Sequence, residues 1–155
     1  MYQAGLAALE ASWLGHLARH STWTFTVANL LHVLGAAMVV GGIAVFDLKI
    51  LAERGRGAWE TGRYAIPLAA TGLALQVPTG LVLLAAEARA LGSNPAFYAK
   101  LAFIALGLAN VALFHARLGG ALRAGTLPPE ARFFAIASLG AWTLTLLAGR
   151  LIAYL

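Results

Sequence analysis

The sequence contains four histidines, and one of them, His32, lies inside a long apolar segment. The stretch LLHVLGAAMVVGG, residues 30–42, surrounds this imidazole with uncharged residues and places several Gly and Ala directly after it. Polar groups in hydrocarbon cost free energy, so an ionisable residue in such a segment marks a candidate functional site. A neutral imidazole is a common ligand of metals and of haem iron. We therefore expect His32 to ligate a b-type haem or a metal ion.

Haem is favoured over copper at His32 because the chain has no Cys and only two Met, Met1 and Met38. Copper(I) prefers soft sulfur ligands. A six-coordinate haem would give the protein a role in electron transfer. Two other roles for His32 stay open: a hydrogen bond to Gln76 or Asn110 that holds helices together, and a proton relay.

The second axial ligand is not fixed by the sequence. His20, His115 or a residue of another chain are the candidates. At a rise of about 1.5 Å per residue, His32 lies about 15 Å and His115 about 28 Å from the outer edge of the membrane. Two nitrogens bound to one iron are only about 4 Å apart. A polar cluster with Asp47 and Arg117 is therefore the preferred account of His115.

Three further sets of polar residues are candidates for binding. His16 and His20, spaced i and i+4, share a helix face and suit a surface metal site, although two ligands alone are a weak indication. Lys100 and Arg150 lie just inside the ends of two apolar segments. Either their charges extend to the lipid head groups, or the two residues form a cationic pair that holds an anion such as a haem propionate. The estimated depths also predict one polar layer near the midplane, made of Asn29, His32, Gln76, Asn110 and Trp142.

Four apolar segments must position these side chains. Of the 155 residues, 61% are hydrophobic and 11% charged, with a mean hydropathy of +0.79, whereas about 25% of an ordinary soluble domain is charged. A spanning helix needs about 20 mostly apolar residues. We expect spans at about 22–48, 64–86, 96–116 and 133–154. They form one transmembrane domain over 1–155, an all-α up-down four-helix bundle in which consecutive later spans are antiparallel neighbours.

Local patterns add detail to this bundle. Residues 2–19 carry an apolar stripe and predict one amphipathic helix in the membrane interface. Pro67 and Pro78 predict a kinked or locally opened second span. Small residues at spacings of four predict close packing of helices. These pairs are Ala37 with Gly41, Gly72 with Gly80, and Ala105 with Ala109.

The loop charges predict the orientation. Seven basic residues follow the first and third spans, and four lie on the other side, so the positive-inside rule places both termini in the periplasm of a bacterial inner membrane. The seven are Lys49, Arg54, Arg56, Arg63, Arg117, Arg123 and Arg132. Anionic lipids explain the net charge of +5 better than nucleic acid does. No cleavable signal peptide is evident.

The short loops and the lack of an acid/base pair favour a subunit over an independent enzyme. The partners we expect are the lipid bilayer and other membrane protein subunits. A cofactor-free accessory subunit of a larger membrane complex is the main alternative to a haem protein. Copper or other metal handling in the membrane is the second alternative.

The motifs HVLGAAMVVGGIAVFDLKIL, NPAFYAKLAFIALGLAN and SLGAWTLTLLAGRLIAYL resemble a family of uncharacterised bacterial four-span membrane proteins. That family has His-x-x-Gly and Asp-Leu-Arg/Lys in the first span, Asn-x-x-Phe-x-x-Lys before the third and Gly-Arg near the end of the fourth. The chain is also distantly similar to copper-resistance D-type membrane proteins and, in layout, to four-helix b-type cytochromes. Through the resemblance, His32, Gly35, Asp47, Lys100 and Arg150 match the pattern.

Overall fold

The computed structural model describes residues 2–53 and 56–155, and seven helices account for most of these two ranges. Met1 and Arg54, which entered the sequence analysis, lie outside the described residues. The four long helices are α3 (Thr22–Glu53), α4 (Ala58–Ala86), α6 (Pro95–Arg123) and α7 (Ala131–Leu151). Each is long and apolar enough to cross a membrane. The predicted all-α four-helix membrane bundle is confirmed.

The first three long helices extend beyond the predicted spans at the end away from the termini. The span predicted at 22–48 continues to Glu53, and that at 96–116 continues to Arg123. With 32 residues, α3 is about 48 Å long, whereas the hydrocarbon core is about 30 Å thick. Many large apolar side chains along the helices are exposed, as contact with lipid requires.

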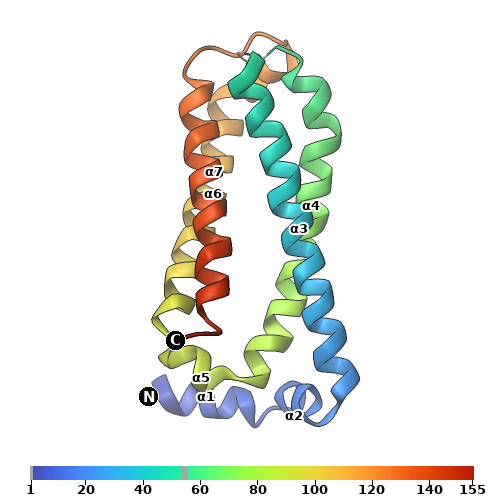
Figure 1. The fold of residues 1–155 in the computed structure, drawn as a ribbon, viewed down its shortest axis with the longest axis vertical. Coiled ribbons are helices and arrows are strands. Elements are labelled where there is room, and N and C mark those ends of the chain that lie inside the picture. The colour runs from blue at the N-terminus through green and yellow to red at the C-terminus, as the bar shows by residue number, and fades with distance from the viewer. Residues whose placement is uncertain (1, 54–55) are drawn as a thin grey trace.

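The long helices form two hairpins, α3–α4 and α6–α7, which meet mainly where α3 packs on α7. We expected the spans at 64–86 and 96–116 to be antiparallel neighbours. Instead, α4 and α6 make few contacts, because the short helix α5 (Ala88–Ser93) carries the chain across between them. Figure 1 shows the two hairpins side by side with this crossing at the lower end.

Glycines bring α3 and α4 into backbone contact. A Cβ on Gly35 would lie 2.8 Å from the Gly72 carbonyl oxygen, and one on Gly72 would lie 2.6 Å from the Gly35 oxygen. The prediction for Gly72 is therefore correct. The pair of Ala37 and Gly41 is not at this contact: Ala37 is exposed, and a Cβ on Gly41 would meet nothing within 4 Å.

The N-terminal segment differs from the single helix predicted over 2–19. It breaks after Glu10 into α1 (Tyr2–Glu10) and α2 (Trp13–His20), because the Ser12 hydroxyl oxygen accepts the Gly15 N–H at 3.2 Å and starts a new helix. Both helices lie across the end of the bundle that also carries the C-terminus. We call this the terminal end and the opposite one the loop end.

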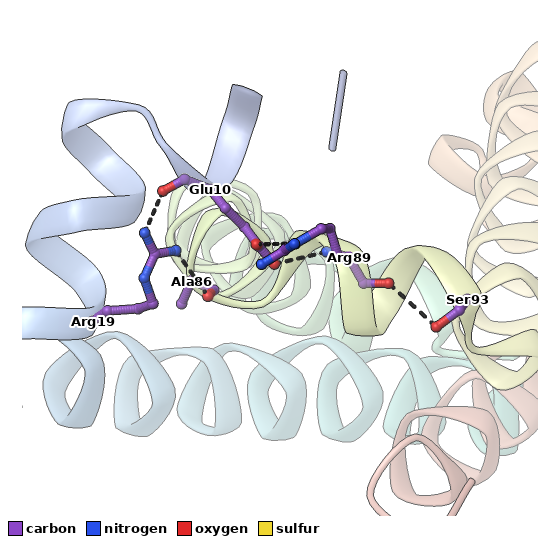
Figure 2. A network of polar contacts seen from close by, with 5 residues as sticks. All are labelled: Glu10, Arg19, Ala86, Arg89 and Ser93. Atoms are coloured by element: carbon purple, nitrogen blue, oxygen red, sulfur yellow. Dashed lines mark hydrogen bonds and ion pairs between the residues drawn. The ribbon is translucent and has the colours of Figure 1, made fainter. Parts of the chain in front are cut away.

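Figure 2 shows how α1 and α2 are attached at the terminal end. The Glu10 carboxylate accepts the backbone N–H of Arg89 at 2.8 Å and its Nε–H at 2.6 Å. These contacts hold the pKa of Glu10 below its ordinary value. Arg19 donates to the Ala86 carbonyl at 3.3 Å and to the Glu10 carbonyl. The Ser93 hydroxyl donates to the Arg89 carbonyl at 3.2 Å, so α5 is tied into the same network.

Two local predictions concern the ends and the course of the spans. The stretch LGSNPAF predicts a cap at Ser93 or Asn94, and Asn94 caps α6, since its side-chain oxygen accepts the Ala96 N–H at 2.9 Å and Pro95 is the first helical residue. The Asn94 amide also donates to the Ile152 carbonyl at 3.1 Å, which ties α6 to the end of α7. The second span was predicted to be either kinked or locally opened, and α4 runs unbroken through Pro67 and Pro78, so only the local opening is excluded.

Candidate functional site

His32 lies half-buried in α3 and is held by α4. Its Nδ1 lies 3.0 Å from the Thr79 hydroxyl oxygen, and that hydroxyl donates to the Leu75 carbonyl at 2.6 Å. Because the hydroxyl hydrogen is used, the oxygen accepts, and Nδ1 is the protonated ring nitrogen. The ring fits closely here because residue 80 is glycine: a Cβ there would lie 3.1 Å from the His32 Cε1.

Lys100 approaches the other side of the imidazole from α6. Its Nζ lies 3.5 Å from the His32 Nε2, and its stem passes Gly149 of α7, where a Cβ would lie 3.7 Å away. Within the described chain, no salt bridge involves this ammonium group. Gln76 donates to the His32 carbonyl at 3.1 Å. We call His32, Gln76, Thr79 and Lys100 the His32 site.

Arg150 does not join Lys100 as a cationic pair. Its guanidinium donates to the Tyr154 hydroxyl at 2.6 Å and stacks over the same ring, 5.0 Å from the centroid. The predicted surface metal site is also incomplete. The rings of His16 and His20 lie with centroids 4.1 Å apart, but residues 2–53 and 56–155 hold no group of three or more His, Cys, Asp or Glu suited to a metal ion.

His115 lies in the loop-end half of α6, exposed, with its Nδ1 2.9 Å from the Val111 carbonyl of its own helix. Arg117 is exposed as well. Asp47, in contrast, is only 5% exposed and has the Ser138 hydroxyl of α7 as its polar neighbour. The predicted polar cluster of these three residues is therefore not formed, although Asp47 and His115 line one pocket.

This pocket is lined by residues of α3, α4, α6 and α7 and has a volume of about 180 Å³. We call it the Asp47 pocket. Its lining is mainly apolar and aromatic, and its polar members are Asp47, Asn110, His115, Ser138 and Trp142. Among the described residues, the Asp47 Oδ2 and the Trp142 Nε1 are buried without a hydrogen-bond partner. Such atoms are rare in native structures and need an explanation.

The predicted polar layer divides between these two places. His32 and Gln76 meet in the His32 site, whereas Asn110 and Trp142 line the Asp47 pocket. Asn110 also donates to the Phe134 carbonyl at 3.1 Å, and Asn29 is exposed. The sequence analysis missed Thr79, whose position three residues after Gln76 puts both on one helix face.

The comparisons with known proteins add no family to this picture. No protein-family model, no curated protein and no solved structure matches the chain. What the protein does must therefore be inferred from the sites themselves.

Proposed function

We propose that this four-helix membrane protein is an electron-transfer subunit that binds a b-type haem with His32 as an axial ligand. The observation that carries the proposal is the fixed state of the imidazole. Thr79 engages Nδ1, so the lone pair of Nε2 points away from α4 toward α6. Metal-ligating histidines commonly donate their other N–H in this way, which sets both the tautomer and the ring orientation.

Lys100 is the second residue that we assign to the haem. Its Nζ lies 3.5 Å from the His32 Nε2, and two nitrogens that share one metal are about 4 Å apart. His20 stacks on His16, and His115 lines the Asp47 pocket, so neither belongs to the His32 site. Lys100 therefore replaces them as the proposed second ligand, in its neutral amine form after the ammonium group has released a proton to solvent. It has no carboxylate partner in the described chain that would have to be displaced.

Three helices contribute to the site of this pair. The His32 site draws on α3, α4 and α6, and α4 and α6 make few contacts with each other. The haem supplies one-electron transfer when bound. The chain contributes an oriented imidazole, a flexible amine and an apolar surrounding, and such surroundings help to set the reduction potential.

The absorption spectrum of protein produced with ample haem tests the proposal. The expected result is a Soret band in the oxidised form and sharp low-spin bands after reduction with dithionite. His32→Ala should abolish haem binding. Lys100→Leu, which offers no ligand atom, should convert the low-spin spectrum to a five-coordinate high-spin one. His115→Ala is the matched control, because this imidazole is exposed and bonds only its own helix.

Wild-type protein that shows no Soret band under these conditions would refute the proposal. His32 would then be a helix-bridging residue in a cofactor-free accessory subunit. Haem that is retained by His32→Ala but lost from His115→Ala would move the ligand to the other end of the bundle and overturn the assignment equally.

A further inference from the structure

The Asp47 pocket has features that the proposed function does not use. Its volume of about 180 Å³ is close to the roughly 150 Å³ of an engineered apolar cavity that binds benzene. The pocket is reached from the side of the bundle between α4 and α6. Ala70 of α4 and Leu108 of α6 both line it and are exposed. A ligand of benzene size therefore fits and has a route from the membrane.

Aromatic rings form much of the wall. Phe46, Phe114, Phe134 and Trp142 all line the pocket. The ring of Phe114 meets those of Phe46 and Phe134 edge to face, with both pairs of centroids 5.8 Å apart. Aromatic faces attract cations through the ring quadrupole, most strongly where water is excluded.

Asp47 places a carboxyl group in this aromatic surrounding. The residue is 5% exposed, and its Oδ2 has no partner within the described chain. The basic side chain in the lining, His115, bonds the Val111 carbonyl instead. Buried charges are normally paired, and carboxylates inside membrane proteins mark ion or substrate sites. A cation would pair with the carboxylate form of Asp47 and supply the partner that its Oδ2 lacks.

We propose that the Asp47 pocket binds a small organic cation, in which an ammonium group pairs with Asp47 and a benzene-sized apolar part packs against the four aromatic rings. Neither the acid nor the rings alone would select such a ligand. The acid distinguishes it from neutral compounds, and the pocket volume distinguishes it from larger cations. The site is separate from the His32 site, so this inference does not depend on haem binding.

Equilibrium binding of radiolabelled benzylammonium to the whole chain in lipid nanodiscs tests the inference. Benzyl alcohol, which keeps the ring and lacks the charge, is the comparison ligand. Saturable binding of the amine, at least about tenfold tighter than that of the alcohol, is expected, because charge-assisted hydrogen bonds are the strong ones. Asp47→Asn should weaken amine binding by about tenfold or more and leave the alcohol unaffected.

Two pairs of variants keep the test decisive. Glu53→Gln removes an exposed carboxylate of the same helix, which pairs with Lys49, and should leave binding unchanged. Ala70→Leu narrows the pocket and should weaken binding, whereas Ala74→Leu, one turn along α4 and outside the lining, should not. Equal affinity for amine and alcohol, or amine binding that survives both Asp47→Asn and Ala70→Leu, would overturn the proposal.

Discussion

In the His32 site, polar side chains from three helices bond one another, whereas in the Asp47 pocket two buried polar atoms lack a partner. The first arrangement contributes to stability, because each polar group regains a hydrogen bond that it lost on leaving water. The second arrangement costs stability, because desolvation is not compensated. The two sites therefore differ in their effect on the stability of the protein, and three predictions test this difference.

The largest effect is expected at the backbone contact between α3 and α4, two helices that contribute to both sites. Gly72→Leu places a side chain where the Gly35 carbonyl and α3 already lie. We expect the free energy of unfolding, measured by denaturant titration in detergent, to fall by about 3 kcal/mol. Gly41→Leu is the control, since a Cβ there meets nothing within 4 Å. Equal losses in both variants would show that this contact does not hold the hairpin together.

Two substitutions with smaller and opposite expected effects on the free energy of unfolding should distinguish the His32 site from the Asp47 pocket. Thr79→Val keeps the shape but removes the hydroxyl that bonds His32, so the free energy of unfolding should fall by about 1 kcal/mol. Asp47→Leu replaces an unpartnered buried acid, and the same measurement should show no loss or a gain. Thr71→Val, which removes an exposed hydroxyl bonded only within α4, controls for the loss of a hydroxyl. A large loss in Asp47→Leu would contradict the comparison.

The smallest effect concerns the helices at the terminal end. Contacts with Arg89 lower the pKa of Glu10. They therefore stabilise the folded terminal end at any pH above the ordinary carboxyl pKa of about 4.3. This stabilisation is lost as the pH falls through the lowered pKa of Glu10. A spin label at the exposed position Ala8 should therefore become more mobile as the pH falls from about 5 to below the lowered pKa of Glu10, with no change near Asp47.

Glu10→Gln is the matched variant for this pH effect. Its label at Ala8 should be mobile already at neutral pH and should respond little to acid, because the titrating group is gone. The chain has no native Cys, so a single introduced Cys carries the label. An immobile label in Glu10→Gln at neutral pH would show that other contacts hold α1.

The sequence alone predicts the spans well, because the length and polarity of the bilayer leave few alternatives. It also limits the cap of α6 to Ser93 or Asn94, because capping depends on neighbouring residues. It predicts less well which polar side chains meet. Distance along a helix gives the depth of His32 and Asn29 but not the direction in which each points, and Asn29 is exposed.

The same limit explains the other differences. Asp47 and His115 were placed at one level, and both line one pocket, yet Asp47 faces α7 and His115 is exposed. The sequence also does not show that α6 packs against α7 and makes few contacts with α4. A short link permits contact between successive helices without requiring it. In this chain α5 forms that link and keeps α4 and α6 apart.

This crossing by α5 has a consequence for how the protein is made. Each hairpin satisfies its own backbone hydrogen bonds, so α3–α4 can enter the bilayer during synthesis before α6–α7 exists. Assembly is then the association of two preformed halves along the face between α3 and α7. A chain divided in the link between them would keep every helix intact, and its two fragments could still find each other in the membrane.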